Sequence, residues 1–294
     1  MPENNPDGKY FKGGKSLFQD DFSNIDVVTT ATVRPELIDL TYLSFCDRVL
    51  SKFKKKRLII NIDPVGNGNR TVSDVLAVCN KYFDEVVYRC PERPSFSAGF
   101  KWCWEQCRSD LVLHLEDDWF IKRKVDVSDM LSWFDKDEHI SSILFGKKLH
   151  KFPIDGIVGG GRFSPNPCFV RKKFIDEALV FFSLDYDPEE QYTNPPDDRQ
   201  KALGHWKVKI YGKIDEPDYV VDTGTMWRKH HRLDKWDLDK KQPGGNAVNT
   251  TWKRNGMKFW LGIWFDFQYY RFVNSLRAKH AVSMFYEGLR PSQK

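Results

Sequence analysis

The stretch Leu111-Val-Leu-His-Leu-Glu-Asp-Asp-Trp-Phe120 decides the fold prediction. Its first five residues are typical of a buried strand, and three consecutive carboxylates, Glu116, Asp117 and Asp118, follow directly. In an α/β protein, ligands bind beyond the carboxyl ends of parallel strands. Adjacent negative charges repel one another, so beside a core they need a cation or a polar ligand to offset them. The alternative, a strand that ends in a solvated acidic turn, stays open at this point.

The chain before this stretch alternates strand-like and helix-like segments. Apolar runs rich in β-branched residues occur at residues 25–31, 58–62 and 85–88. Segments with helical spacing of their apolar residues separate them, at residues 36–53, 71–83 and 97–107. This alternation predicts βαβ units with right-handed crossovers, and therefore a doubly wound, mostly parallel sheet flanked by helices. A nucleotide site is expected at the switch point of such a sheet.

Composition narrows the class of protein. The 294 residues are 40% hydrophobic and 30% charged, which is typical of a globular chain. A net charge of +5 suits an enzyme that handles phosphorylated small molecules better than a nucleic-acid binder. The six cysteines lack the paired Cys-x-x-Cys spacing of a zinc site, so we expect reduced core thiols. No glycine-rich dinucleotide fingerprint or Walker-type Gly-Lys-Ser/Thr is present, which removes the usual support for those two functions.

Four features in order resemble the GT-A family of nucleotide-sugar-dependent glycosyltransferases, in particular its inverting family-2-like group. They are the opening segment Thr29-Thr-Ala-Thr-Val-Arg-Pro35, Asp63 at the end of the second strand, Glu116-Asp-Asp118, and an acidic segment (186–199) before a histidine-containing one. The resemblance covers residues 24–235. It divides them into a nucleotide-binding half (24–120) and an acceptor half (121–235), between a flexible arm (1–23) and a C-terminal amphipathic extension that packs on the domain (236–294).

The resemblance implies a GT-A-like α/β fold in a single domain with a helical, aromatic C-terminal extension. It also implies a hexosyl or pentosyl transferase that moves a sugar from a nucleotide-sugar donor to a hydroxyl of a glycan or glycoconjugate, with inversion and with Mn²⁺ or Mg²⁺. A divalent cation favours carboxylate oxygens and stabilises a leaving diphosphate. Asp118 is the first expected metal ligand, with Glu116 and His231 beside it. Here the triplet reads Glu-Asp-Asp where the family has Asp-x-Asp.

Nucleotide contacts are expected from the ends of the first, second and fourth strands. Thr30, Thr32 and Arg34 close the first strand, and the planar guanidinium of Arg34 suits a phosphate. The resemblance implies that Asp63 accepts a hydrogen bond from the base, and that Glu116 or Asp117 holds the ribose or a metal-bound water. Two alternatives stay open: Asp63 as a turn cap before a proline, and Arg34 as a surface arginine.

An inverting transfer needs a general base for the acceptor proton. The candidates are Glu190, Asp198 and Glu189, although Asp198 also suits a helix N-cap. Acceptor contacts are expected from Gly160, Gly161 and Asn166, because glycines let a backbone approach a ligand closely, and from Trp227 by stacking. The alternatives are a surface turn for the glycines and core packing for Trp227.

The C-terminal segment 257–286 has aromatic residues at roughly helical spacing. It suits core closure, a homodimer face, or an interfacial helix on a membrane. No secretion-like start and no apolar run near the ~20 residues of a membrane span occur. We therefore expect a cytoplasmic protein, with peripheral membrane contact as the alternative, and no nucleic-acid partner.

Two rival functions compete with the transferase. A sugar nucleotidyltransferase usually has a glycine-rich phosphate loop after its first strand, which this sequence lacks. A non-catalytic carbohydrate-binding protein on a transferase scaffold has no need for the carboxylates and histidines that are present here. Metal-dependent turnover of a donor separates the enzyme from the binding protein.

Overall fold

The computed structural model describes residues 22–66, 68–147, 157–158, 163–193, 197–212, 216–231, 233–237, 250–254 and 268–280. The predicted N-terminal arm, apart from residues 22 and 23, lies outside these residues, as do the predicted acceptor residues Gly160 and Gly161. Most of the segment 257–286 also lies outside them. All statements below concern the described residues.

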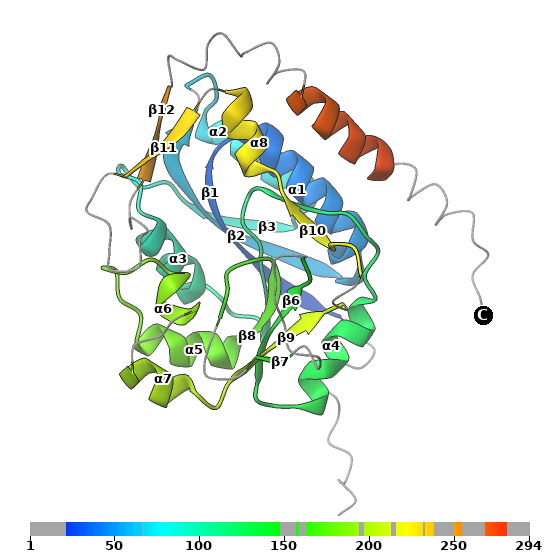
Figure 1. The fold of residues 1–294 in the computed structure, drawn as a ribbon, viewed down its shortest axis with the longest axis vertical. Helices are drawn as coiled ribbons and strands as arrows, with labels where there is room; N and C mark the ends of the chain where they lie inside the picture. Colours follow the sequence, from blue (N-terminus) through cyan, green and yellow to red (C-terminus); the bar gives the residue numbers. More distant parts are fainter. Residues whose placement is uncertain are drawn as a thin grey trace, which may run out of the picture.

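The described chain is built around one eight-stranded sheet with the order β3-β2-β1-β4-β8-β6-β9-β7 (Figure 1). Its strands are β1 (Asn24–Val33), β2 (Lys55–Gly66), β3 (Glu85–Arg89), β4 (Leu111–His114), β6 (Ile140–Phe145), β7 (Ile157–Val158), β8 (Cys168–Arg171) and β9 (Lys207–Tyr211). Six of these strands run in one direction, whereas β7 and β8 run in the other. The predicted α/β fold class, with a mostly parallel sheet flanked by helices, is confirmed.

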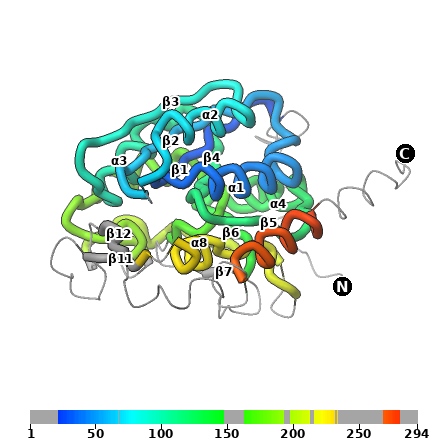
Figure 2. Tube along the Cα trace, turned by 90° about the horizontal axis from the view of Figure 1, so that it is seen from above, coloured from blue at the N-terminus to red at the C-terminus, as the bar shows by residue number. Residues whose placement is uncertain are grey.

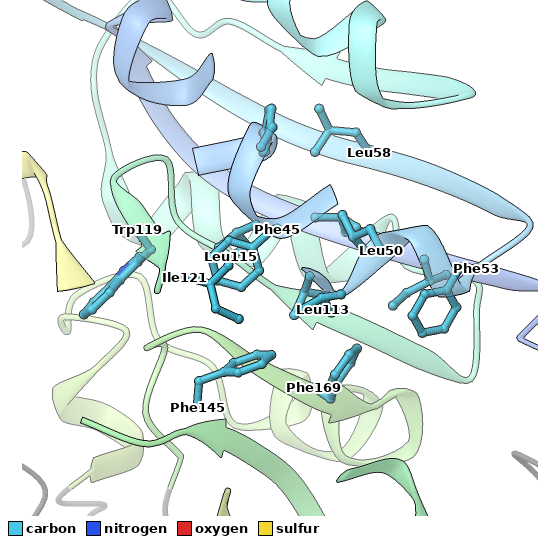
Figure 3. Packing of buried hydrophobic residues seen from close by; sticks show 14 of the residues in the cluster. Phe45, Leu50, Phe53, Leu58, Leu113, Leu115, Trp119, Ile121, Phe145 and Phe169 are labelled. Atoms are coloured by element: carbon cyan, nitrogen blue, oxygen red, sulfur yellow. The ribbon is translucent and has the colours of Figure 1, made fainter. Parts of the chain in front are cut away.

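Helices cover both faces of this sheet. On one face lie α1 (Pro35–Arg48), α2 (Val72–Tyr82) and α4 (Val127–Lys136), and on the other lie α3 (Phe96–Glu105) and α5 (Lys172–Val180). Alternate residues of a strand point to opposite faces, so Val27 enters the first core and Val28 the second. Figure 3 shows the first core, where Phe45 of α1 meets Leu115, and its ring lies 5.7 Å from that of Phe145.

Local sequence signals explain where several helices begin. Pro35 occupies the first turn of α1, where its missing N–H costs no hydrogen bond. Ser95 accepts a hydrogen bond from the backbone of Ala98 and caps α3. Thr71 and Asp74 form a reciprocal capping box at the start of α2. These caps agree with the helix starts that the sequence predicts to within two residues.

One predicted strand end is wrong. The sequence suggests that Asp63 and Pro64 close the second strand, but β2 continues to Gly66. Its pairing with β1 runs regularly as far as Thr32 and Asp63, then shifts register so that Val33 faces Gly66. The shift passes over Pro64, which has no N–H to donate to a ladder. Asp63 therefore lies within the strand, beside the end of β1.

The described residues also form two small sheets and four short helices. The strands are β5 (Trp119–Ile121) with β10 (Val220–Asp222), and β11 (Leu233–Asp237) with β12 (Thr250–Arg254). The helices are η1 (Leu50–Lys52), α6 (Glu190–Thr193), α7 (Asp197–Leu203) and α8 (Gly224–His230). The antiparallel pairing of β5 with β10 is not predicted from the sequence. In this pairing Asp222 lies opposite Trp119, the residue that directly follows the acidic triplet.

A further helix spans residues 268–280 and lies beside α1 in both views (Figures 1 and 2). Leu276 packs with Leu40 and Phe120, and Tyr269 packs with Trp227. None of the helices in the described parts of the chain has the length and apolar character needed to cross a bilayer. The domain boundaries, the cytoplasmic location, dimerisation and peripheral membrane contact stay predictions.

Candidate functional site

The carboxyl ends of β1, β2, β4 and β6 bring most of the predicted polar residues to one edge of the sheet. Because β1 pairs in parallel with β4, with Val28 opposite His114, the residues after β4 lie beside the end of β1. The Thr29 hydroxyl confirms this proximity by donating to the Leu115 carbonyl over 2.7 Å. The acidic triplet therefore faces the segment that contains Thr32 and Arg34.

Both the carboxylate and the backbone carbonyl of Asp117 accept hydrogen bonds from protein groups. Its Oδ2 accepts a hydrogen bond from Nε of Arg34 over 2.8 Å and from the backbone N–H of Thr32 over 3.0 Å, while Nη2 of Arg34 contacts Oδ1. Its backbone carbonyl accepts the hydroxyl of Thr41. Asp117 is 2% exposed and Arg34 is 6% exposed. This pair is a buried, bidentate ion pair that ties the end of β1 to the end of β4.

Asp118 and Glu116 are less completely compensated. Asp118 receives one hydrogen bond from Nη2 of Arg34, over 2.8 Å. Burial, opposed by Arg34 and reinforced by Asp117 and Asp222, raises the pKa of Asp118 to about 6. Burial and the nearby Asp118 raise the pKa of Glu116 well above its usual range, although the indole of Trp119 donates to its carboxylate. Both carboxyls therefore lie where additional positive charge stabilises their ionised forms.

The segment after β10 encloses Asp118 from the other side. Thr223 donates from both its backbone N–H and its hydroxyl to the Asp118 carbonyl, over 2.8 Å each. A Cβ atom on Gly224 would overlap the Asp118 carboxylate, so a larger residue at the start of α8 would displace that side chain. Asp222 itself is exposed and accepts hydrogen bonds from the start of α8. This arrangement adds Asp222 to the acidic groups at the edge.

The described residues contain no group of three His, Cys, Asp or Glu side chains placed to hold a metal ion. His231 contacts Glu36, with its Nε2 3.5 Å from Oε1 of that residue. The donor chemistry nevertheless fits a hard divalent cation, since Asp118 and Glu116 supply carboxylate oxygens whose charge the protein compensates only in part. The ligand set of Asp118, Glu116 and His231 stays a prediction.

Glu36 organises the segment that contains the predicted residues Trp227 and His231. The indole of Trp227 donates to Oε1 of Glu36 over 2.8 Å. Although burial raises it, hydrogen bonds from His231, the Glu36 backbone and Trp227 lower the pKa of Glu36 to about 2. Trp227 is fully buried, so in this structure it offers no face to an acceptor sugar. This position agrees with the alternative role for Trp227, which is packing in the core.

A second polar group lies at the end of β2. Asn61 donates to the Asp63 carboxylate over 2.9 Å and accepts a hydrogen bond from Nε of Arg89 over 2.8 Å. Burial raises the pKa of Asp63, although Asn61, the Ser95 backbone N–H and Arg89 lower it. The partly buried Thr30 nearby has a hydroxyl with no hydrogen-bond partner within the described part of the chain. Both predicted nucleotide contacts therefore lie on the edge that holds the acidic triplet.

The third polar group lies at the ends of β6 and of the segment before β8. Lys147 donates to Oδ1 of Asn166 over 2.6 Å, the amide of Asn166 donates to the Ser164 hydroxyl, and Ser164 donates to Oε1 of Glu189 over 3.4 Å. Burial and Asp187 raise the pKa of Glu189, which Lys147 and Ser164 lower. The predicted residues Asn166 and Glu189 thus share one hydrogen-bonded chain, and the charge of Glu189 also acts on Glu116.

The other two predicted bases occupy different positions. Glu190 is the first residue of α6, and its backbone N–H donates to Asp187 over 3.2 Å. Asp198 is exposed on α7, which packs through Leu203 and the buried Arg199 rather than through this residue. No hydrogen bond or ion pair joins Asp198 to the acidic triplet within the described residues. All three assignments stay predictions.

Sequence reasoning did not identify five residues of this edge as functional candidates: Glu36, Asn61, Lys147, Ser164 and Asp222. Lys147 could have been found in the same way as the acidic triplet, because it lies two residues after the end of an apolar segment (residues 143–145) in the sequence. Asp222 begins a polar cluster that the sequence contains, but its relation to Asp118 depends on the pairing of β5 with β10. Glu36, Asn61 and Ser164 have no comparable signal, because each has a partner in another element: Trp227, Arg89 and Glu189 respectively.

No protein-family model matches the chain, and no curated protein sequence matches it. Solved structures that are similar include S. aureus TarS 1–349 in complex with UDP, at 13% identity and a TM-score of 0.48 over 71% of this chain and 64% of that chain. The mannosyltransferase PcManGT from Pyrobaculum calidifontis, in complex with GDP-Man and Mn²⁺, matches at 10% identity and a TM-score of 0.42 over 91% and 76%. The CMP:2-keto-3-deoxy-manno-octonic acid synthetase complexed with CTP matches at 12% and 0.42, over 71% and 97%. The chain spans between 36% and 64% of the length of the TarS chains, and these similarities concern the overall fold.

Proposed function

We propose that this chain is a glycosyltransferase that moves a sugar from a nucleotide-sugar donor to a hydroxyl of a glycan or glycoconjugate, with a divalent metal and with inversion. One observation supports it above the others: two under-compensated carboxylates, Glu116 and Asp118, lie at the carboxyl edge of an α/β sheet beside a third, Glu189. A cationic ligand, such as the metal that accompanies a nucleotide diphosphate, relieves this mutual repulsion. Asp63, Thr30 and Thr32 supply polar groups for the nucleotide on the same edge.

These residues have different roles in the proposed reaction. Asp118, with Glu116 nearby, would hold Mn²⁺ or Mg²⁺, which when bound neutralises the charge of the departing diphosphate. Glu189 is favoured as the base because it belongs to the hydrogen-bonded chain at this edge. It takes the proton of the acceptor hydroxyl while that oxygen bonds to the anomeric carbon from the face opposite the diphosphate. The bond from the anomeric carbon to the phosphate oxygen breaks, and its electron pair leaves with the nucleoside diphosphate.

Calorimetric titration with UDP-, GDP-, dTDP- and CMP-sugars, with and without Mn²⁺, tests the donor site. We expect one nucleotide class to bind, more tightly with metal, and we expect Asp118→Asn to abolish the metal effect. Asp198→Asn, which removes an exposed carboxylate from α7, is the matched control and should bind like the wild type. Absence of binding for every donor under both conditions contradicts the proposal.

Transfer rates with the identified donor then separate the three candidate bases. Glu189→Gln should reduce kcat by roughly 10²- to 10⁴-fold, the usual contribution of a general base, while the donor affinity stays unchanged. Glu190→Gln and Asp198→Asn should retain most of the activity. A comparable loss in either of those variants, with Glu189→Gln active, transfers the role to the other carboxylate.

A further inference from the structure

Lys147 is a half-buried residue whose ammonium group interacts electrostatically with the acidic edge of the sheet, formed by Glu116, Glu189, Asp218 and Asp222. Its backbone position is fixed by the preceding residue, because Gly146 exchanges hydrogen bonds with Tyr211 and Tyr219 on either side. A Cβ atom at Gly146 would lie 2.7 Å from the Tyr211 carbonyl oxygen, so the close approach requires glycine. The ammonium group lies 4.8 Å from the centre of the Trp119 ring. Lys147 is therefore held at the site by both its backbone and its side chain.

The ammonium group fixes the direction of the hydrogen bonds that lead to Glu189. Lysine has three donors and no acceptor, so Asn166 must turn its carbonyl oxygen toward Lys147. The amide NH₂ of Asn166 then points to the Ser164 oxygen and donates to it. With its oxygen already accepting, the Ser164 hydroxyl donates to Glu189 over 3.4 Å. In each of these three hydrogen bonds the donor is on the Lys147 side and the acceptor is on the Glu189 side. The reason is that Lys147, at the far end of the series, can only donate.

The direction of these hydrogen bonds matters because several negative charges surround Glu189. Glu189 is faced by Asp187 and Glu190 of its own segment, by Glu116 after β4, and by Lys147 after β6. Lys147 is the cation among these groups. It forms no ion pair within 4 Å with a carboxylate of the described residues, so it acts on Glu189 through Asn166 and Ser164 and through its charge at longer range.

We propose that Lys147 is a positioning residue for the proposed base, acting through Asn166 and Ser164 to orient the Glu189 carboxylate that receives the acceptor proton. This inference rests on the proposed function. Lys147 forms and breaks no covalent bond in it. A lysine that only neutralised the acidic edge would work through charge alone, whereas this role also requires the donor–acceptor order of the two intermediate side chains.

Four variants separate these roles. Lys147→Met removes charge and direction, Lys147→Arg keeps both because arginine also has only donors, and Asn166→Asp keeps the contact with Lys147 but cannot donate to Ser164. Lys173→Met is the matched control, because Lys173 is an exposed lysine on α5 that also lies near a tryptophan ring, 5.8 Å from the centre of Trp206. Thermal unfolding of each variant establishes that it is folded.

The measurements are kcat, the acceptor KM, the pH dependence of kcat and the donor affinity by calorimetry. We expect Lys147→Met and Asn166→Asp to lower kcat by about 10- to 100-fold, the usual cost of losing a residue that orients a reacting group, with donor affinity unchanged. Lys147→Arg and Lys173→Met should stay close to the wild type. In Lys147→Met the acid limb of the pH profile should shift upward by about one pH unit. Unchanged kcat in Asn166→Asp overturns the inference, and so does an unchanged pH profile in Lys147→Met.

A second readout does not depend on transfer. Selective ¹³C labelling of glutamate, with Glu189→Gln to assign the signal, gives the titration midpoint of Glu189 in the wild type and in Lys147→Met. We expect the midpoint to rise when Lys147 is removed, and an unchanged midpoint overturns the inference even in an active transferase. If the wild type binds no donor, the proposed function fails, while this titration still reports whether Lys147 acts on Glu189.

Discussion

The protein compensates the negative charges to different degrees on the two sides of the acidic triplet, the Arg34 side and the Lys147 side. On the Arg34 side, the Asp117 carboxylate accepts hydrogen bonds from a guanidinium and a backbone amide, and both Asp117 and Arg34 are buried. On the Lys147 side, Glu116 has a hydrogen bond from Trp119, and the ammonium group reaches Glu189 only through intermediate side chains. The first arrangement stabilises the fold and leaves little for a ligand. The second leaves charge that a ligand can compensate.

Removing Arg34 should produce the largest effect on stability. Arg34→Met leaves Asp117 buried without its counter-ion, and breaking such a pair typically costs about 3–5 kcal/mol. Urea unfolding measures this loss. Arg34→Lys should recover only part of it, because an ammonium group cannot reproduce the bidentate contact. A loss below about 1 kcal/mol in Arg34→Met would show that the two sides do not differ as described.

His114 tests the packing of the second core, from which β4 leads to Glu116. It is 1% exposed, lies 5.0 Å from the Phe100 ring and 5.9 Å from the Phe163 ring, and neither ring nitrogen has a hydrogen-bond partner within the described residues. Unpaired buried polar groups typically cost about 1–3 kcal/mol. His114→Phe should therefore raise the free energy of unfolding at pH 7 by about 1 kcal/mol, which urea unfolding measures.

The same substitution should change the acid sensitivity of the protein. Burial lowers the pKa of His114 from 6.5 to about 3, so between these values the unfolded state binds a proton that the folded state does not. Stability therefore falls as the pH falls through this window, by on the order of 1 kcal/mol per pH unit. His114→Phe should lack this contribution. Parallel pH dependences for the wild type and the variant contradict the explanation.

Glu36 provides a second test of the Arg34 side. Its pKa is lowered from 4.5 to about 2, so it contributes stability above pH 4.5, and this contribution is lost as the pH falls toward 2. Because the side chain is 30% exposed, solvent reduces the effect, and Glu36→Gln should cost about 1 kcal/mol at pH 7. The wild type and the variant should converge near pH 2 in acid titrations of unfolding. A constant difference at all pH values would indicate a packing effect instead.

Lys147→Met should have the smallest effect on stability and thereby complete the comparison. Its ammonium group is half-buried and forms no close ion pair with the described carboxylates, so its removal should change the free energy of unfolding by less than about 0.5 kcal/mol. Urea unfolding beside Arg34→Met provides the contrast, because each variant removes one positive charge. Losses of similar size would mean that both cations are structural.

The sequence by itself determines the layered architecture of this protein. Apolar runs and helical spacing are local patterns, because side chains alternate along a strand and repeat every 3.6 residues along a helix. They therefore predict β1 to β4 and the helices between them, and they place Glu116, Asp117 and Asp118 at the end of a strand. The strand end at Asp63 is missed, because the continuation of β2 to Gly66 depends on its pairing with β1.

Only the tertiary structure decides which two of the three carboxylates remain available to a ligand. Arg34 and Asp117 are 83 positions apart, and they meet because β1 lies beside β4 in the sheet. Three adjacent acidic residues look alike in a sequence, yet the strand order neutralises the middle one and leaves its neighbours under-compensated. The physical reason is that charge compensation depends on distances of a few ångströms between side chains from different elements, and no local pattern encodes those distances.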